Sequence, residues 1–370
     1  MTDRGDLAAM DVAGRAERLR PLLEEAGADA LVVSDLTNVR YLTGFTGSAG
    51  LVVVTGAGLT FVTDGRYGEQ AEAQLAAAGV DAAIEVSSTA QREAVVGAIE
   101  SASAGRVGLE ADAVTWATQR RWSRDWFADR ELVATTGLVA RLRATKDDGE
   151  LDRLAAAASI ADDALAQVRH RVAEGPTERE FGAELDAAMR AEGADDVSFE
   201  TIVASGPNGA LPHHRPSHRT IVEGDLVVLD FGALLDGYHS DMTRTLVVGE
   251  PTDTARRMLA VVGEAQAAGV AAVAAGVEAK AVDATCRDII AAAGWGDAFL
   301  HGTGHGVGLD IHEDPRVAAT STATLVDRCV VTVEPGVYLP THGGVRIEDT
   351  VVVTPDGCRP LTHTPKATAP

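Results

Sequence analysis

The chain has 370 residues, of which 55 are acidic and 32 are lysine or arginine, so its formal net charge at pH 7 is -23. This length is enough for two domains, each with its own hydrophobic core. The strong negative charge argues against nucleic acid or an anionic membrane as the main partner, and it favours solubility.

Cysteine usage and the amino terminus indicate a cytoplasmic protein. The three cysteines form no CxxC pair and are too few to crosslink a chain of this size, so reduced thiols are expected. Charges at Asp3, Arg4 and Asp6 and the lack of an apolar block argue against an export signal. Residues 42–63 carry no charge, but their five glycines and five threonines favour a β-hairpin over a membrane span.

The first third of the chain alternates short apolar runs with amphipathic segments, which is typical of a small α/β domain. Residues 12–26 are predicted to form a helix, and residues 30–33 a buried strand. Residues 51–55 and 59–63 are expected to pair as a hairpin, in which Gly56-Ala57-Gly58 supplies the positive φ of the turn. Further helices are predicted near 67–78 and 90–103, and further strands near 83–86 and 106–109.

Four aromatic residues follow these elements within a short stretch. We expect them to pack in the core of the domain or at a contact between subunits, rather than around a cofactor. They are Trp116, Trp122, Trp126 and Phe127.

Residues 137–146 are predicted to link this domain to a second one, with a boundary near residue 140. A weak internal repeat then begins. Ala173-Glu174-Gly175-Pro176 precedes a helix to about residue 192, and 101 residues later Ala274-Ala275-Gly276-Val277 precedes a helix to about residue 293. Each is preceded by a long predicted helix, near 149–172 and 253–274. Two similar halves predict a pseudo-twofold arrangement that brings strand ends together at one central site.

Five acidic and imidazole residues in the second half have the setting expected of metal ligands. Three of the acids stand beside apolar strand-like runs, and a buried carboxylate is costly unless it is paired or coordinates a metal. The histidine lies among four glycines, which allow close approach of the backbone; the same turn lacks the lysine of a phosphate-binding loop. The five candidates are Asp230, Asp241, His305, Glu334 and Glu348.

Four carboxylates and one imidazole make an oxygen-rich ligand set, which suits Mn²⁺, Co²⁺ or Zn²⁺. Bridging carboxylates can hold two ions roughly 3.5 to 4 Å apart, so we predict a site for two divalent metal ions, with Mn²⁺ as the first choice. Arg346, two residues before Glu348, is interpreted either as a surface ion pair or as a base that keeps a ligand carboxylate ionised.

Around these residues the sequence resembles the pita-bread metallopeptidases, the superfamily of methionine aminopeptidase, aminopeptidase P, prolidase and creatinase. The likeness is strongest to the Xaa-Pro peptidase branch, because residues 38–48 and 61–67 resemble its amino-terminal domain. The resemblance covers nearly the whole chain. It implies an α/β (α+β) protein with an amino-terminal creatinase-type domain, residues 1–140, and a pita-bread catalytic domain, residues 141–370. It also implies a homodimer.

The resemblance further assigns roles to residues outside the ligand set. His213 and His312 match histidines that contact substrate near the metals, although the neighbouring His214 leaves the register of the first open. Glu334 matches the carboxylate that handles the proton. Arg316 matches an arginine that binds the carboxylate of a dipeptide, and a surface ion pair with Asp314 or Glu313 is the alternative. His214 and His218 are otherwise expected to be solvated, and Tyr338 to pack in a strand or to donate to a ligand oxygen.

We therefore predict an exopeptidase that hydrolyses Xaa-Pro bonds in dipeptides or short peptides. The alternative within the branch is aminopeptidase P, which releases the first residue of longer peptides. Methionine aminopeptidase is disfavoured by the whole amino-terminal domain. A creatinase-like hydrolase is disfavoured by the complete metal set, and a non-enzymatic binding protein by the intact ligands and both histidines.

Overall fold

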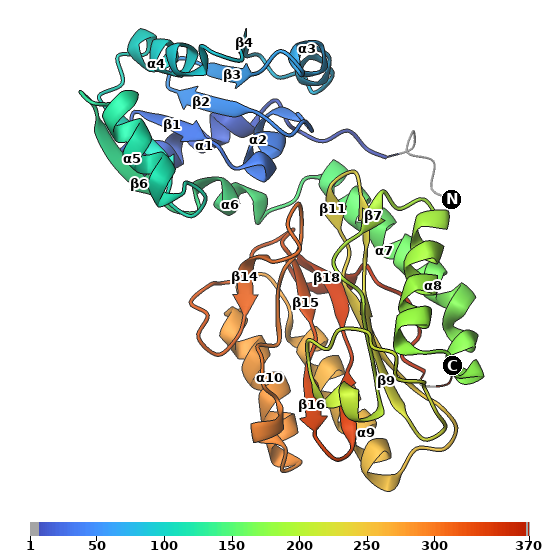
Figure 1. The fold of residues 1–370 in the computed structure, drawn as a ribbon. Helices are drawn as coiled ribbons and strands as arrows, with labels where there is room; N and C mark the ends of the chain where they lie inside the picture. Colours follow the sequence, from blue (N-terminus) through green and yellow to red (C-terminus); the bar gives the residue numbers. More distant parts are fainter. Residues whose placement is uncertain (1–6, 368, 370) are drawn as a thin grey trace. The chain divides into compact units, whose positions relative to one another are not determined.

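The computed structural model describes residues 7–367 and residue 369, so Asp3, Arg4 and Asp6 lie outside the described part (Figure 1). The chain forms two compact units. One contains residues 9–143, and the other contains residues 144–370 together with the residues before Ala9. The arrangement is mixed α/β, which confirms the predicted fold class. No helix within the described residues is both long and apolar enough to cross a bilayer.

The first unit is built around one six-stranded sheet with the order β4-β3-β2-β1-β5-β6. Strand β1 is buried at all four residues because it lies inside the sheet, antiparallel to β2 and parallel to β5. The strands are β1 (Ala30–Val33), β2 (Leu51–Thr55), β3 (Leu59–Thr63), β4 (Ala83–Val86), β5 (Arg106–Glu110) and β6 (Glu131–Thr135). The helices are α1 (Arg15–Glu25), α2 (Leu36–Thr43), α3 (Gly68–Ala77), α4 (Gln91–Ser101), α5 (Trp116–Asp125) and α6 (Leu138–Arg143).

The hairpin of β2 and β3 is confirmed, but the prediction for its turn is wrong. Neither Gly56 nor Gly58 has a positive φ. Instead the hydroxyl of Thr55 accepts hydrogen bonds from the backbone N–H groups of Ala57 and Gly58, both at 3.2 Å. The turn is therefore held by a threonine side chain and does not need the conformational freedom of glycine.

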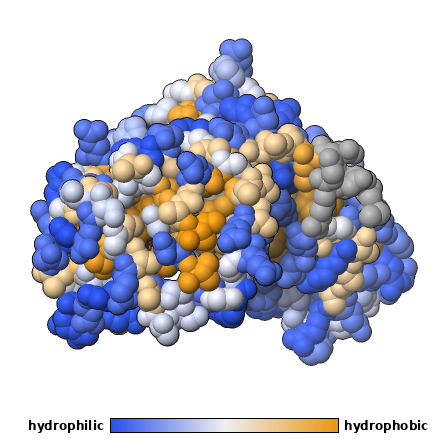
Figure 2. Space-filling view, turned by 90° about the horizontal axis from the view of Figure 1, so that it is seen from above, coloured by the Kyte–Doolittle hydropathy of each residue, from blue (hydrophilic) through white to orange (hydrophobic). Residues whose placement is uncertain are grey.

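The aromatic stretch is divided between core and surface. Trp122 and Phe127 are buried, and Trp122 stacks on Trp126 with ring centroids 4.9 Å apart. Trp116 does not pack in the core, because it is 74% exposed. Hydrophilic residues cover most of the face seen in Figure 2, and apolar residues gather in smaller patches between them.

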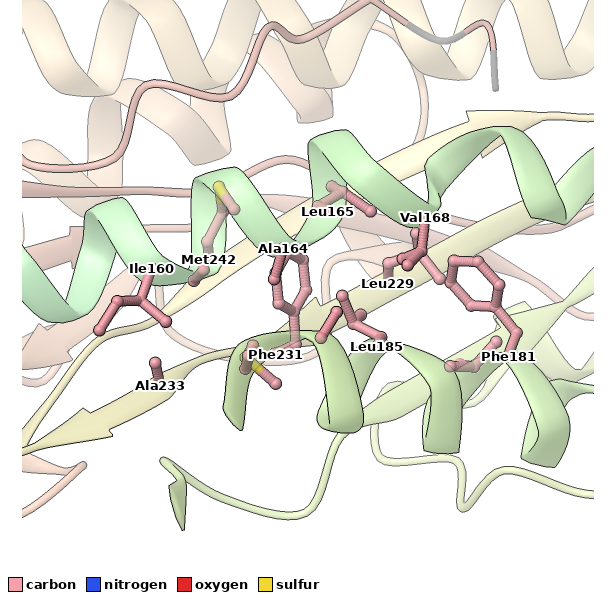
Figure 3. Close-up of a cluster of buried hydrophobic side chains, with 14 of the residues drawn as sticks. Ile160, Ala164, Leu165, Val168, Phe181, Leu185, Leu229, Phe231, Ala233 and Met242 are labelled. Atoms are coloured by element: carbon pink, nitrogen blue, oxygen red, sulfur yellow. The ribbon is translucent and has the colours of Figure 1, made fainter. Parts of the chain in front are cut away.

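The second unit contains two helix pairs. The first pair is α7 (Asp148–Val168) and α8 (Glu178–Ala191), and each of these helices begins with a capping box, formed by Asp147 with Glu150 and by Thr177 with Glu180. The second pair is α9 (Asp253–Ala272) and α10 (Ala279–Ala292). The apolar faces of α7 and α8 pack on β9 (Leu226–Phe231) and its neighbours (Figure 3).

The internal repeat is visible in the structure. Gly175 and Gly276, 101 residues apart, both adopt a left-handed conformation with φ of 75° and 86°. The helices that follow them, α8 and α10, each have 14 residues. Residues Thr177 and Glu278, also 101 apart, each form an isolated β-bridge to a later segment. The two halves thus repeat a helix-helix-strand pattern around the central strands, as in a pita-bread fold.

The strands of the second unit form several small sheets. Their orders are β12-β9-β8, β11-β10-β7, β14-β13-β15-β18-β19 and β16-β17. The remaining strands are β7 (Asp196–Val197), β8 (Ile202–Ser205), β10 (Ala233–Leu235), β11 (Tyr238–His239), β12 (Met242–Val247), β13 (Gly304–Gly306), β14 (Glu313–Val317), β15 (Val330–Val333), β16 (Gly336–Leu339), β17 (Gly343–Arg346), β18 (Asp349–Thr354) and β19 (Gly357–Pro360). Short 3₁₀ helices span Arg169–Glu174, Gly206–Ala210 and Gly296–Ala298.

Candidate metal centre and its cavity

The candidate ligands lie at the ends of buried strands. Asp230 is near the end of β9, and Asp241 directly precedes β12, which runs antiparallel to β9. Glu334 follows β15, and Glu348 lies between β17 and β18. Each acid lies at or next to the end of a strand whose residues are largely buried, so the burial of that strand also carries the carboxylate inward. His305 is the middle residue of β13.

These side chains converge on one point. Carboxylate oxygens of Asp230, Asp241 and Glu348 all lie within 4.8 Å of one another, a spacing at which three ligand atoms can hold an ion. Nε2 of His305 lies 3.5 Å from Oδ2 of Asp241 and 3.5 Å from Oε1 of Glu334. The structure thus brings together all five residues singled out in the sequence.

The electrostatics of this cluster require positive charge. Burial raises the pKa of Asp241 and of Glu348 well above the usual range, with further upward shifts from neighbouring carboxylates. Burial raises the pKa of Glu334 to about 8. Oε2 of Glu348 accepts a 2.7 Å hydrogen bond from Thr243, but its Oε1 is buried without a partner among the described residues. An orphaned buried carboxylate oxygen is costly, and a cation would satisfy it.

His305 has the tautomer and the neutral charge that a metal ligand needs. Nδ1 of His305 lies 2.9 Å from the carbonyl oxygen of Gly306, which can only accept, so Nδ1 carries the proton. The lone pair of Nε2 then faces Asp241 and Glu334. Burial lowers the pKa of His305 to about 4, which keeps the imidazole neutral, as coordination requires. The residues present therefore fit a divalent metal centre.

Arg346 is a buried base beside this cluster, so its interpretation as a surface ion pair is wrong. Its side chain is 4% exposed, and Nη2 lies 2.6 Å from Oδ2 of Asp230. Nη1 donates to the hydroxyl of Tyr338 at 2.8 Å, and this hydroxyl lies 2.8 Å from Nε2 of His301. Asp230, Arg346, Tyr338 and His301 therefore form a continuous chain of hydrogen bonds.

The sequence analysis did not single out His301. Nδ1 of His301 lies 2.8 Å from the carbonyl oxygen of Gly302 and so carries the proton, which leaves Nε2 to accept from Tyr338. Burial lowers the pKa of His301 to about 4. The available signal in the sequence was its position four residues before the candidate ligand His305, in His301-Gly302-Thr303-Gly304-His305. In the structure both imidazoles border the same cavity.

A cavity of 660 Å³ opens beside the carboxylates. His213, His312 and Arg316 all line it, and the His312 ring meets the His305 ring edge to face at 4.4 Å between centroids. Burial, aided by the nearby Arg316, lowers the pKa of His312. The apolar part of the wall is formed by Phe199, Ile202, Pro212, Ile311 and Ala318.

Arg316 is not neutralised by its neighbours in sequence. Glu313, one of its two expected partners, forms a 3.0 Å ion pair with the buried Lys146. Among the residues that the structure describes, Arg316 makes no ion pair. Its charge therefore remains available to the cavity. A second arginine on the wall, Arg215, is instead paired with Glu200.

The structure also separates His213 from His214. His213 lines the cavity, whereas Nε2 of His214 lies 2.9 Å from Oε2 of the fully buried Glu178. The expectation that His214 is a solvated loop residue is therefore wrong. The expectation for His218 is confirmed, since that residue is exposed.

The fold and the carboxylate–histidine cluster are those of a pita-bread metallopeptidase. In agreement, metallopeptidase family M24 matches residues 152–355, and the creatinase/prolidase N-terminal domain matches residues 15–145. The chain belongs to metallopeptidase family M24, a family of metal-dependent peptidases.

Full-length relatives agree with this assignment. A Bacillus subtilis (strain 168) protein named "Uncharacterized peptidase YqhT" is 45% identical over 352 residues, which cover 95% of this chain and 98% of the relative. The structure of an Xaa-Pro dipeptidase from Bacillus anthracis has a TM-score of 0.93 and 40% identity, over 97% of this chain and 99% of that one. An X-Pro aminopeptidase from Thermotoga maritima MSB8 has a TM-score of 0.86 and 33% identity, over 95% and 99%.

Proposed function

We propose that this protein is an Xaa-Pro dipeptidase that uses two divalent metal ions. The observation that carries the proposal is the cluster of buried carboxylates, of which Arg346 pairs with Asp230 alone, and above all Oε1 of Glu348, which has no partner among the described residues. The ions would be held by Asp230, Asp241, His305, Glu334 and Glu348. We expect Mn²⁺ in both positions, with Co²⁺ or Zn²⁺ as alternatives, because these ions accept a set of mostly oxygen ligands.

When bound, a pair of such ions activates water and polarises the scissile carbonyl. The chain's own residues then supply the proton transfers. Burial raises the pKa of Glu334 to about 8, so in the protein without metal this group gains and loses its proton close to neutral pH. Glu334 lies 3.5 Å from Nε2 of His305 and lines the cavity, as Asp241 also does, and the family resemblance assigns the proton transfer to Glu334.

His213 and His312 stand on the cavity wall where the reacting peptide would lie. We assign them to stabilise the charge that develops on the carbonyl oxygen and on the departing nitrogen. Arg346 would hold the carboxylate of Asp230 in place through their 2.6 Å contact.

Selectivity for proline follows from the substrate's chemistry. An Xaa-Pro bond is a tertiary amide without an N–H, so a site that relies on a donor at that position cannot use it. The apolar wall that includes Phe199, Ile202 and Ile311 offers a surface for the pyrrolidine ring. Arg316 offers a guanidinium fork for the free carboxylate that directly follows the ring in a dipeptide.

The alternative is an Xaa-Pro aminopeptidase, as in the relative from Thermotoga maritima named above. A panel of Xaa-Pro dipeptides and Xaa-Pro-Yaa tripeptides, each with Mn²⁺, Co²⁺ or Zn²⁺, separates the two. We expect higher kcat/KM for the dipeptides. A preference for tripeptides would assign the protein to the aminopeptidases instead.

We further propose that the protein acts in the cytoplasm as a homodimer. The reduced cysteines support the location, since all three are free. The strongly exposed Trp116 in the amino-terminal unit supports a subunit contact, because tryptophan is enriched at protein interfaces.

A further inference from the structure

We propose that Glu178 is a positioning residue for His213, acting through a buried polar hub that fixes the segment of residues 205–217. The inference rests on the proposed function, because it assigns to His213 a catalytic role. Glu178 precedes all five candidate metal ligands in sequence, and its hydrogen bonds go to Ser205, Asn208, His214 and Ser217 and to none of the five.

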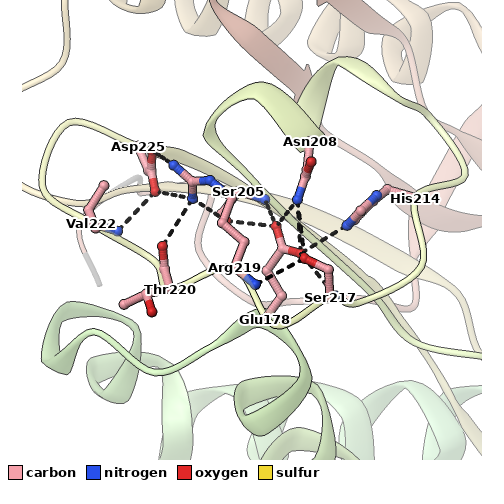
Figure 4. Close-up of polar contacts among 9 residues, drawn as sticks. All are labelled: Glu178, Ser205, Asn208, His214, Ser217, Arg219, Thr220, Val222 and Asp225. Atoms are coloured by element: carbon pink, nitrogen blue, oxygen red, sulfur yellow. Dashed lines mark hydrogen bonds and ion pairs between the residues drawn. The ribbon is translucent and has the colours of Figure 1, made fainter.

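The hub is a single carboxylate with donors on all sides (Figure 4). Oε1 of Glu178 accepts from the backbone N–H of Ser205 at 2.8 Å and from its hydroxyl at 2.7 Å. Oε2 accepts from the backbone N–H of Ser217 at 3.0 Å and from its hydroxyl at 2.6 Å. The amide of Asn208 donates at 3.0 and 3.1 Å to the two oxygens, and Nε2 of His214 lies 2.9 Å from Oε2.

These bonds keep the carboxylate ionised although its side chain is fully buried. Burial by itself would raise the pKa of Glu178, but the hydrogen bonds from Ser217, Ser205 and Asn208 outweigh burial and lower the pKa to about 2. Glu178 is also the first residue of α8, where the helix dipole favours negative charge. The carboxylate of the hub is therefore charged at neutral pH.

The hub holds both ends of the segment that carries His213. Ser205 ends β8, Ser217 lies beyond His213, and His214 is the next residue in the chain. The His213 side chain makes no hydrogen bond to any residue that the structure describes, so the cavity side offers it no anchor. Its direction is set by its backbone, and the hub fixes that backbone on both sides.

The repeat shows that the fold itself does not need an acid at this position. The residue equivalent to Glu178 in the second half is Ala279, 101 residues later, which is the first residue of α10. Both are buried at the start of helices of equal length. A helix of this type therefore begins without a buried carboxylate in one half, and the half that has one also carries His213.

The test is a double-mutant cycle of Glu178→Gln and His213→Ala, assayed on an Xaa-Pro dipeptide with saturating Mn²⁺. In Glu178→Gln an amide NH₂ group replaces one of the two accepting oxygens. This group is a donor and would face the donors of Ser205, Asn208 or Ser217, so the segment of residues 205–217 would shift. We expect Glu178→Gln to lower kcat about 10- to 100-fold, as a displacement of about 1 Å of a catalytic group can, with little change in KM. In the His213→Ala background, Glu178→Gln should cost less than about threefold.

His214 provides a second test that does not depend on a buried charge. His214→Gln places an amide N–H where Nε2 of the imidazole was, and should keep most of the activity. His214→Ala should lose about as much as Glu178→Gln. The control is Glu180→Gln, which weakens the cap of the same helix, since Glu180 belongs to the capping box with Thr177 and not to the hub. It should lower the thermal unfolding midpoint while leaving kcat unchanged.

Metal content and thermal unfolding are measured for every variant. Equal, independent losses in both backgrounds of the cycle would overturn the inference and leave Glu178 a structural residue. Should Glu178→Gln fail to fold, equal activity of His214→Gln and His214→Ala would overturn it in the same way. Wild-type protein without Xaa-Pro hydrolysis would instead refute the proposed function, whatever the variants do.

Discussion

Replacing Arg316 by alanine is expected to weaken the binding of dipeptides and to spare longer substrates. Arg316 is exposed on the cavity wall and has no ion pair among the described residues, so its charge is free for a substrate carboxylate. A hydrogen bond to a charged group contributes about 1.5 to 3 kcal/mol. Because solvent reaches this side chain, we take the lower end, which corresponds to about a tenfold change in affinity. The loss should therefore appear as about a tenfold rise in KM with kcat nearly unchanged.

The assay compares one Xaa-Pro dipeptide with the matching Xaa-Pro-Yaa tripeptide in the wild type, Arg316→Ala and Arg316→Lys. The lysine variant keeps the charge but loses the planar fork, so we expect it to lie between the other two. A dipeptide amide, which has no carboxylate, should be used equally by all three proteins. Unchanged dipeptide KM in Arg316→Ala, or an equal loss on both peptide lengths, would refute the clamp.

Three further predictions concern ligands, pH and assembly. Glu348→Ala should lower both bound metal, by elemental analysis, and rate, whereas His312→Ala should keep its metal and lose mainly kcat; equal metal retention would contradict this division. Ionisation of Glu178, with its pKa lowered to about 2, should contribute about 3 kcal/mol of stability above pH 4.5, which is lost as pH falls toward 2. Urea unfolding at pH 7 and pH 3 should therefore show a smaller pH effect in Glu178→Gln than in the wild type. Sedimentation at micromolar concentration should give a dimer, and a fully active monomer would exclude the proposed assembly.

That the four carboxylates and His305 come together could be predicted because the evidence for each of them is local in sequence. Glu334 directly follows an apolar strand, and Asp230 lies at the end of another. The apolar residues of each strand predict that the strand is buried and that its carboxylate is buried with it. The helices of the two halves could be predicted for the same reason, since their caps and apolar faces repeat within a few residues. The left-handed Gly175 and Gly276 also fell where the repeat placed them.

The hydrogen-bonded surroundings of the site could not be predicted in this way. Glu178 and Ser217 are 39 residues apart, and His301 and Tyr338 are 37 apart, so no local pattern connects them. The same holds for His214, whose partner becomes visible only when α8 is placed beside the segment that follows β8. In the turn after β2 a local pattern was present but misleading. Its glycines predicted a turn with positive φ, whereas the turn in the structure is stabilised by the hydroxyl of Thr55.

The central claim is that hydrolysis of Xaa-Pro bonds depends on metal held by the buried carboxylates. The most direct measurement strips the protein by exhaustive chelation, confirms the loss of metal by elemental analysis, and titrates Mn²⁺ back while dipeptide hydrolysis is followed. We predict no hydrolysis by the stripped protein and a return of activity that is complete near two equivalents per chain. Full activity in the metal-free protein would contradict the account.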